Sequence, residues 1–333
     1  MRNIFLPVLI IALLTLTEGF TGAQQPKKVP TVGILGPASP SAPIIQSFKQ
    51  GLRELGYVEG QNIILDGRSS SWNTVFGKDV PEYHQGLADE VARLGVDVIV
   101  AFAAPPTVAA MKATKTIPIV MTFPGDAASE GFVASLERPG GNVTGVSGLV
   151  TELGGKWLEL LKEAIPSIRR VAVLWNPRSE DRFPTWKGVE LAARSLQVDL
   201  AWMGVRNERD LARAFRPATH WGRVDAFIVL PGGIFFATMP QIVELALKSR
   251  LPGISWRGDF ADAGGLMGYG ANRLEQARRA AYVVDKILKG VKPSDVPVER
   301  PTQFELVINL KTAKEIGVTI QPEVLMFADR VIK

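Results

Sequence analysis

The sequence predicts an α/β protein with two doubly wound, Rossmann-like lobes joined by a multi-segment hinge. Three observations lead to this prediction. From Val29 onward, short continuous apolar runs alternate with helix-like segments, which is typical of parallel strands covered on both faces. The same alternation starts again in the second half of the chain. The tail after Gly264 is too short for a third domain, so we expect it to add elements to both lobes and to cross between them.

The first half of the chain carries the elements of one lobe. Strands are expected at 29–36, 62–67, 96–102 and 117–123, and helices at 44–55, 79–94 and 106–114. The first helix places Ile44, Phe48 and Leu52 on one face, and Gly56 follows it as a residue suited to a left-handed helix end. A turn at 139–141 then leads into a last strand at 142–147.

The second half repeats this order. A helix near 153–164 precedes expected strands at 171–175, 196–203, 224–231 and 251–255, with helices near 184–195, 208–216 and 239–249 between them. The tail carries a helical stripe over 274–288, a strand at 304–310 and a further helix. Val96-Asp97 and Val224-Asp225 begin corresponding strands in the two halves, which favours two lobes of similar construction.

The first 23 residues have the pattern of a secretory signal peptide. Arg2 gives a positively charged start, Ile4 to Leu16 form an apolar run too short to span a bilayer comfortably, and Thr21-Gly22-Ala23 supply small residues for cleavage. We therefore expect cleavage near Ala23 and a periplasmic or secreted protein. An uncleaved anchor helix is the alternative interpretation of this segment.

The composition excludes several classes of site. The chain has no cysteine, which rules out a lipid-modified N-terminal cysteine, disulfides, thiolate metal ligands and a cysteine nucleophile. Its two histidines, His84 and His220, lie in different halves with no metal-ligand spacing around them, so no metal and no cofactor are expected. The formal net charge of +5 comes from dispersed basic residues, so no nucleic-acid partner is expected.

The stretch 136–148, LERPGGNVTGVSG, contains fragments of three motifs. It lacks the Lys-Ser/Thr pair of a phosphate-binding loop, and Leu149 stands where a nucleophile elbow after Ser147 needs glycine. Asn142-Val143-Thr144 matches the glycosylation pattern, but modification is not expected in a bacterial-type exported protein. We interpret the stretch as a turn and strand that end the first lobe and lead to a hinge at 149–152. With these motifs incomplete, the protein is not expected to be an enzyme.

Binding residues are expected beyond the carboxyl ends of the strands, where open α/β sheets hold their ligands. The sequence places small, hydroxyl, amide and acidic residues there, several of them at helix starts whose backbone N–H groups suit an anionic group. In the first half the candidates are Ser39, Ser41, Ala104, Thr107 and Asp126. In the second half they are Asn176, Ser179, Gly232 and Tyr269, with Trp256 and Asp259 nearby. Two such rows facing each other across a cleft fit ligand capture better than bond breaking.

Several long stretches carry a family resemblance. They are GLRELGYVEGQNI (51–63), ATKTIPIV (113–120), FVASLERPGGNVTG (132–145), VAVLWNP (171–177), GGLMGYG (264–270), AAYVVDKILKG (280–290) and FELVINLKTAKEIGVTI (304–320). With them the chain resembles ABC-transporter substrate-binding proteins of the tryptophan/tyrosine-binding type, which have a type I periplasmic binding fold. The resemblance implies a hinge of about three crossing segments and ligand contacts at or beside Ser39, Thr107, Asp126, Asn176 and Tyr269.

The sequence departs from the commoner family pattern at four of the expected ligand loops. Ala104 stands where serine or threonine is frequent, Ala127 replaces a proline, Gly232-Gly233 replaces Asp-Pro, and Gly268 replaces a serine. Each change removes a polar or shaping group, and a buried hydrogen bond contributes about 0.5–1.5 kcal/mol net. The ligand is therefore left open between a free amino acid and a wider or less polar compound, such as an aromatic one.

The resemblance also sets the expected organisation and function. The expected parts are a signal peptide at 1–23, an N-terminal lobe at 29–150 plus about 271–292, and a C-terminal lobe at 151–270 plus about 301–333. We expect a monomeric solute-binding protein that closes about its hinge on a small organic ligand and delivers it to an ABC permease in the inner membrane. A ligand sensor for a membrane receptor and an exported α/β enzyme are the alternatives.

Overall fold

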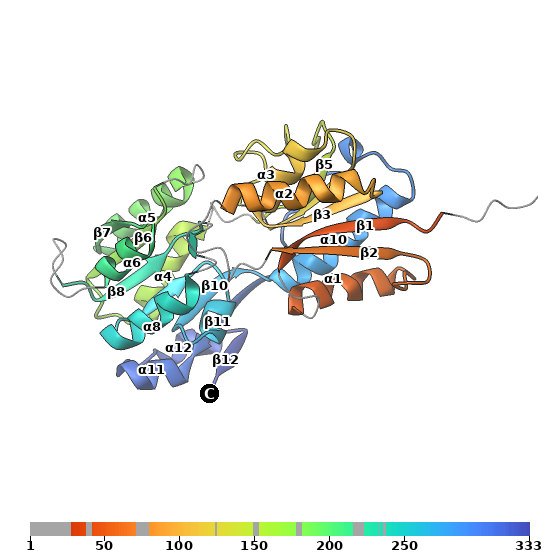
Figure 1. The fold of residues 1–333 in the computed structure, drawn as a ribbon. Helices are drawn as coiled ribbons and strands as arrows, with labels where there is room; N and C mark the ends of the chain where they lie inside the picture. Colours follow the sequence, from red (N-terminus) through yellow and green to blue (C-terminus); the bar gives the residue numbers. More distant parts are fainter. Residues whose placement is uncertain are drawn as a thin grey trace, which may run out of the picture.

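The computed structural model describes residues 28–37, 42–70, 80–123, 125–148, 153–177, 182–215, 223–232, 234–235 and 238–333. The expected signal peptide lies outside these residues. The described chain forms two α/β lobes that lie side by side, with the lobe of β1–β5 on the right of Figure 1 and the lobe of β6–β12 on the left. The two-lobed α/β fold predicted from the sequence is confirmed.

In the described chain, five parallel strands form the sheet of the first lobe, in the order β2-β1-β3-β4-β5. They are β1 (Thr31–Pro37), β2 (Ile64–Ser70), β3 (Val98–Phe102), β4 (Ile119–Thr122) and β5 (Val143–Val146). Successive side chains of a strand point to opposite faces, and both faces are buried here. Val98 and Val100 of β3 pack on one helix layer, whereas Ile99 and Ala101 pack on the other.

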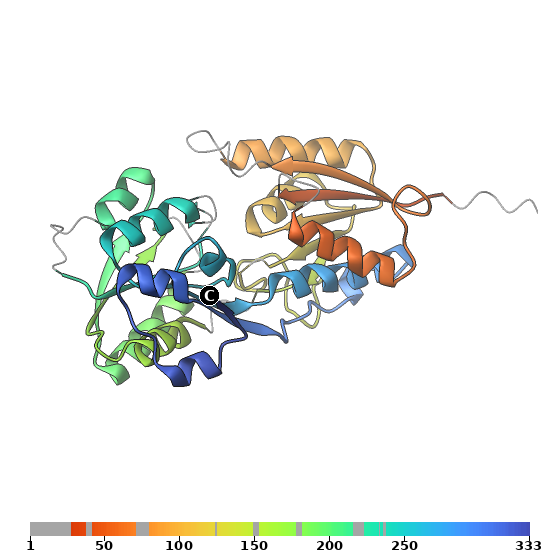
Figure 2. The ribbon, with the colours of Figure 1, turned by 90° about the horizontal axis from the view of Figure 1, so that it is seen from below.

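Helices from distant parts of the sequence cover the two faces of this sheet. The helices are α1 (Pro43–Glu54) and α10 (Arg273–Leu288) on one face, and α2 (Val80–Arg93) and α3 (Ala104–Ala113) on the other. Figure 2 shows α10, in light blue, lying beside α1, in orange-red. Its apolar stripe of Ala277, Ala281 and Val284 packs against Phe48 and Leu52 of α1. The chain therefore returns from its C-terminal part to complete the first lobe.

The second sheet contains the same strand order with an extension. Its described strands run β12-β11-β10-β9-β8-β6-β7, and the part β7-β6-β8-β9-β10 repeats the order of the first lobe. The strands are β6 (Arg170–Trp175), β7 (Asp199–Gly204), β8 (Ala226–Val229), β9 (Gly253–Ser255), β10 (Met267–Ala271), β11 (Phe304–Asn309) and β12 (Arg330–Ile332). Only the pairing of β10 with β11 is antiparallel among the described strands.

The helices of the second lobe surround one continuous apolar core. They are α4 (Gly154–Ala164), α5 (Arg182–Leu196), α6 (Glu208–Ala214), α8 (Met239–Ser249), α9 (Asp259–Asp262), α11 (Leu310–Ile316) and α12 (Pro322–Met326), and a short 3-10 turn, η2 (Pro293–Asp295), lies in the tail. The strand expected at 196–203 begins later, at Asp199, because α5 continues to Leu196. Trp157, Phe227 and Phe260 are fully buried in this core.

Three connections join the lobes. One leads from β5 to α4 through 149–152, which lie outside the described residues. The second leads from β10 in the second sheet directly into α10 in the first lobe, and the third leads from Glu299 to β11. Connections two and three touch each other, because the backbone N–H of Asn272 donates to the carbonyl of Gln303 at 2.9 Å.

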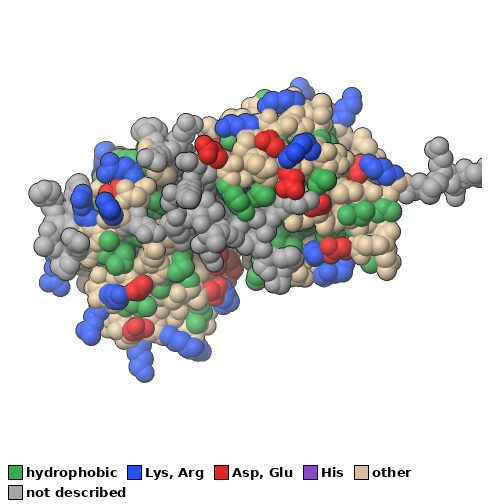
Figure 3. Space-filling view, in the orientation of Figure 1, with side chains coloured by type: hydrophobic (Ala, Val, Ile, Leu, Met, Phe, Trp, Pro, Cys, Tyr) green, Lys and Arg blue, Asp and Glu red, His purple; other side chains and the backbone are tan. Residues whose placement is uncertain are grey.

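Charged side chains of both signs are dispersed over the face of the molecule that Figure 3 shows. In Figure 3, lysine and arginine side chains are spread over both lobes, with aspartate and glutamate among them. Within the described ranges, no helix is both long and apolar enough to cross a membrane.

Candidate functional site

The carboxyl ends of the two sheets face each other. Figure 1 shows β1 entering at the far end of the first lobe and running toward the second, whereas β8 runs toward the first. All strands of the first sheet are parallel, as are β6–β10, so their other carboxyl ends share these two edges. Each sheet has the strand order whose topological switch point lies beside its first strand, where α/β proteins bind ligands. The candidate site is therefore the space between the lobes.

The end of β3 supplies one wall of this space. Ala103 follows the strand with φ 82° and ψ 168°, a conformation that is rare outside glycine. Ala104 begins α3 and is half-buried. Thr107 is fully buried, and its hydroxyl donates to the carbonyl of Ala103 at 2.9 Å. The hydroxyl of Thr107 thus holds the strained turn in place, and a direct contact of Thr107 with ligand stays a prediction.

The end of β4 carries two further residues at the same edge. Phe123 follows the strand with φ 35°, again unusual for a residue with a side chain, and its ring packs on Phe102. Asp126 comes three residues later, and its Oδ1 accepts the backbone N–H groups of Ala128 and Ser129 at 3.1 and 3.2 Å. This capped turn fixes the position of Asp126. Ser39 and Ser41, the candidates after β1, lie outside the described residues.

The second lobe brings two of the predicted residues together. Asn176 follows β6 and Gly232 follows β8, and a Cβ atom on Gly232 would lie 3.3 Å from Cβ of Asn176. Ser179, the remaining candidate after β6, lies outside the described residues. Asn176 and Gly232 are thus neighbours at the edge that faces the first lobe.

Tyr269 has a different setting from the loop that the sequence suggested. It lies within β10, its carbonyl accepts the indole N–H of Trp157 at 2.7 Å, and its ring stacks on Phe304 of β11. The glycines on either side of it serve a close backbone contact. Added Cβ atoms would lie 2.2 Å from the Arg257 carbonyl oxygen at Gly268 and 1.9 Å from the Trp256 carbonyl oxygen at Gly270. The absence of a serine at 268 therefore allows the 256–258 loop to lie directly on β10.

A charged group lies beside this loop, and of its three residues the sequence prediction named only Asp259. We call it the arginine cluster: Arg257 and Asp259 after β9, and Arg273 at the start of α10. Arg257 donates to both carboxylate oxygens of Asp259, and Arg273 donates to Asp259 Oδ2 at 3.2 Å. The guanidinium of Arg273 also lies 4.4 Å from the ring centroid of Phe123. Arg273 therefore touches both lobes at the edge where their strands end.

The stretch 136–148 ends the first lobe, and its polar side chains bond to neighbouring backbone groups. Asn142 donates its side-chain amide to the Ile117 carbonyl at 2.8 Å, Thr144 donates its hydroxyl to the Val296 carbonyl at 2.6 Å, and Ser147 is buried. Gly145 has φ 139°, and a Cβ atom there would lie 2.0 Å from the Met121 carbonyl oxygen. The sequence prediction of a strand at 142–147 corresponds to β5, and the expected hinge residues 149–152 lie outside the described residues.

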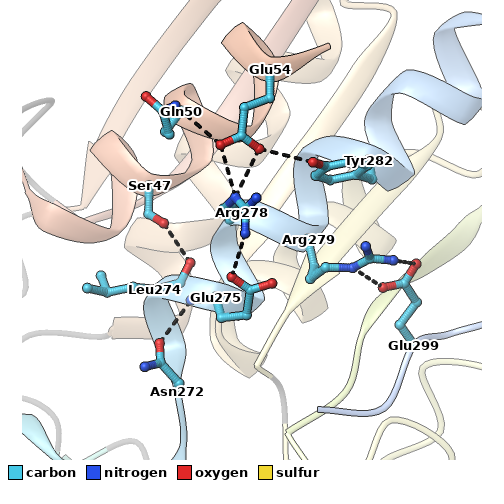
Figure 4. Close-up of polar contacts among 10 residues, drawn as sticks. All are labelled: Ser47, Gln50, Glu54, Asn272, Leu274, Glu275, Arg278, Arg279, Tyr282 and Glu299. Carbon is cyan, nitrogen blue, oxygen red and sulfur yellow. Dashed lines mark hydrogen bonds and ion pairs between the residues drawn. The ribbon is translucent and has the colours of Figure 1, made fainter. Parts of the chain in front are cut away.

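The first-lobe ends of the three connections form one hydrogen-bonded block. Glu299 donates its backbone N–H to Gly145 and accepts from that of Ser147, both at 2.9 Å. Its carboxylate accepts from Arg279 of α10 at 2.8 and 2.9 Å, and Gln276 of α10 donates to the Ser147 carbonyl at 2.8 Å. Figure 4 shows the Arg279–Glu299 pair and, on the other side of the helix, the contacts of α10 with α1. Bending is therefore expected beyond this block, toward the second lobe.

A cavity of about 320 Å³ lies at this hinge. All three connections line it, through Val146, Asn272, Glu275, Gln276, Arg279 and 299–303. Asn272 and residues 300–303 lie on the second-lobe side of the hydrogen-bonded block, so we expect this part of the cavity wall to move when the angle between the lobes changes. Among the described residues, no group of three or more histidine, aspartate or glutamate side chains is arranged to hold a metal ion.

The chain is similar to known solute-binding proteins over most of its length. The family described as ABC transporter substrate binding protein matches residues 34–332. A tyrosine-binding protein from Clostridioides difficile is 27% identical over 271 residues, which are 81% of this chain and 75% of that protein.

Two solved structures extend this similarity to the fold. The structure of an ABC domain in complex with L-Trp from Streptococcus pneumoniae has a TM-score of 0.80 and 26% identity, and covers 91% of this chain and 99% of that chain. A conserved domain protein from Vibrio cholerae has a TM-score of 0.79 and 26% identity, and covers 91% and 100% of the two chains. Together with the strand order of both lobes, these similarities identify the type I periplasmic binding fold.

Proposed function

Because the chain belongs to the ABC transporter substrate-binding protein family, we propose that it captures an aromatic amino acid or a closely related compound between its lobes. One observation carries the proposal. The carboxyl ends of the two sheets face each other, three segments connect the lobes, and Arg273 contacts residues of both lobes. The tyrosine-binding relative and the L-Trp complex support the ligand class. Phe123, Trp256 and Tyr269 supply aromatic rings near these edges.

We propose further that closure about the hinge is what an ABC permease in the inner membrane recognises. A ligand that touches both lobes makes its full set of contacts only in the closed form, so binding shifts the population toward that form. The fixed block at Ser147, Gln276 and Glu299 supports this motion, because it confines bending to the short segments beyond it. The protein would act as a periplasmic or secreted monomer after cleavage near Ala23 and would carry out no chemical step on its ligand.

The lobe division that follows from this proposal differs little from the predicted one. Residues 29–150 with α10 would move as the first lobe, and 151–270 with the segment from β11 onward would move as the second. The packing of α10 on α1 and the pairing of β11 with β10 favour this division.

Calorimetry and small-angle scattering on the purified protein test the proposal. We expect L-tryptophan or L-tyrosine to bind at a ratio of one to one and to reduce the radius of gyration, whereas L-alanine should do neither. An absence of both heat and compaction with every aromatic amino acid would refute the ligand class. Compaction with an unrelated metabolite would support hinge closure but show that the proposed ligand class is wrong.

A further inference from the structure

Arg273 is a charged residue whose side chain bridges residues at both strand-end edges. It follows β10 and begins α10, so its backbone belongs to the second connection between the lobes. On the first-lobe side, its guanidinium lies 4.4 Å from the ring centroid of Phe123. On the second-lobe side, it donates to Asp259 at 3.2 Å. A ligand that enters between the lobes would meet this group at the hinge end of the space.

The rest of the arginine cluster is held rigidly. Arg257 and Asp259 form a two-bond pair, in which the planar guanidinium matches the carboxylate. The loop that carries Arg257 lies on β10, which is possible only because residues 268 and 270 are glycines. The side chains of Arg257, Arg273 and Asp259 are 12%, 23% and 44% exposed. Two guanidinium groups are therefore fixed around one partly exposed carboxylate.

This arrangement places positive charge where it is costly. Burial, and then the nearby charge of Arg257, lower the pKa of Arg273 to about 9, although Asp259 opposes the shift. Burial alone would raise the pKa of Asp259, but Arg257 and Arg273 hold it below its usual value. An anionic group added beside Arg273 would offset the repulsion between the two guanidiniums. The cluster thus favours a ligand that brings a carboxylate.

Phe123 places an aromatic ring beside the guanidinium of Arg273. Its ring centroid lies 5.8 Å from that of Phe102 and 4.4 Å from the guanidinium carbon of Arg273. Its backbone keeps φ 35°, a strained value of the kind that tends to persist at ligand-binding sites. An aromatic face next to a fixed guanidinium matches a compound that joins a ring to a carboxylate.

We propose that Arg273, supported by Arg257, binds the carboxylate of the ligand and makes the protein select aromatic amino acids over amines that lack this group. The inference rests on the proposed function and names the part of the ligand that the arginine cluster recognises. Asp259 and Phe123 are positioning residues in this proposal, because they hold the Arg273 guanidinium between the lobes.

Calorimetry with L-tryptophan and tryptamine tests this inference, because the two compounds differ only in the carboxylate. Hydrogen bonds to a charged group contribute about 1.5–3 kcal/mol, so the wild type should prefer L-tryptophan by on the order of 100-fold. In Arg273→Gln, L-tryptophan should bind about 100-fold more weakly and tryptamine should be unchanged, so that the preference disappears. Arg273→Lys keeps the charge but not the planar fork, and should retain part of the preference.

Arg278→Gln is the matched control. Arg278 lies on the same helix but pairs with Glu54 and Glu275, away from the arginine cluster. It should keep the full preference for L-tryptophan. A thermal melt of each variant establishes that it is folded. If Arg273→Gln does not fold, the comparison of L-tryptophan with tryptamine is made on Arg273→Lys instead.

The outcomes separate the two levels of the proposal. Equal weakening of both compounds in Arg273→Gln would mean that Arg273 has only a structural role, and an unchanged preference would place the carboxylate elsewhere. Either result overturns the inference and leaves the proposed function intact. If the wild type binds neither L-tryptophan nor L-tyrosine, the proposed ligand class fails first.

Discussion

Two helix pairs in the molecule pack through glycine, one in each lobe, and they differ in how they are secured. In the first lobe, a Cβ atom on Gly51 of α1 would lie 2.5 Å from the carbonyl oxygen of Arg278 of α10. In the second lobe, a Cβ atom on Gly154 of α4 would lie 2.3 Å from the carbonyl oxygen of Thr185 of α5. In both places the backbones approach so closely that no side chain fits between them.

The first pair is secured by a polar network between the two helices. Arg278 pairs with Glu54, Tyr282 also donates to Glu54, and Ser47 donates to the carbonyl of Leu274 (Figure 4). No ion pair joins the described side chains of α4 and α5. α4 and α5 are separated in sequence only by β6, whereas α10 arrives from the second lobe. We infer that the network fixes α10, a helix whose first residue is Arg273, to the first lobe.

The largest effect is expected for Gly51→Val. The new side chain would push α10 away from α1, and overpacking of this kind costs about 3 kcal/mol. Because α10 also positions Arg273, the affinity for ligand should fall with the free energy of unfolding. Denaturant titration and calorimetry measure the two effects.

Gly86→Ala is the control for that variant. Gly86 lies in α2, and a Cβ atom there would meet nothing within 4 Å. Replacing an unhindered helical glycine by alanine stabilises by about 0.5–1 kcal/mol. A Gly51→Val protein as stable as the wild type would show that the contact between α1 and α10 is dispensable.

A smaller effect is expected at the second crossing for Gly155→Ala. The nearest atom to its added Cβ, the Gly188 carbonyl oxygen, is 3.2 Å away, so a shift of a few tenths of an ångström makes room. The gain in helix propensity of about 1 kcal/mol offsets this strain, so stability should stay within about 1 kcal/mol of the wild type. Gly154→Ala should lose about 2 kcal/mol, because its contact is a backbone oxygen at 2.3 Å. Equal stability of the two variants in denaturant titration would contradict the proposed packing.

The same glycines show which features of the fold could be predicted from the sequence and which could not. The order of strands and helices could be predicted because parallel strands are apolar on both faces and helices have an apolar stripe. Gly56 could be predicted as a left-handed helix end, but the sequence does not reveal which atoms a glycine such as Gly51 or Gly268 approaches. Tyr269 was expected beside a ligand loop at a strand end, whereas it lies within β10, and the close approach of the 256–258 loop explains the glycines on either side of it.

The candidate site was harder to predict for a similar reason. Residues at strand ends can be predicted from the sequence, which is why Asn176 and Gly232 are both candidates, but their closeness to each other is seen only in the structure. Arg273 could not be found this way, because a charged residue at a helix start is usually solvated. Its role depends on Phe123, which is 150 positions earlier in the chain, and on the return of α10 to the first lobe.

Removing the polar network should have a smaller and salt-dependent effect. Arg278→Gln deletes the pair with Glu54 and Glu275, both of which are partly exposed. Exposed ion pairs contribute little, and salt screens them. The melting temperature should therefore fall less than in Gly154→Ala. The difference from the wild type should shrink in 1 M NaCl, because the screening length is roughly threefold shorter there than at 0.1 M. A loss that salt does not reduce would indicate packing of the arginine stem instead of charge.

The smallest effect concerns the pH dependence of the same network. Hydrogen bonds from Gln50 and then Tyr282, and to a smaller extent the hydrogen bond and charge of Arg278, hold the pKa of Glu54 below its ordinary value of 4.5, although burial opposes them. A lowered pKa stabilises the folded state above 4.5, and this contribution is lost as the pH falls through the folded-state value. The wild type should thus be slightly more stable than Glu54→Gln at pH 7, and the two should converge on acidification. Melting curves from pH 7 to pH 3 measure this, with Gly155→Ala as a control whose difference stays constant. A difference in melting temperature between the two proteins that persists at pH 3 would show that Glu54 stabilises the packing of α10 independently of its charge.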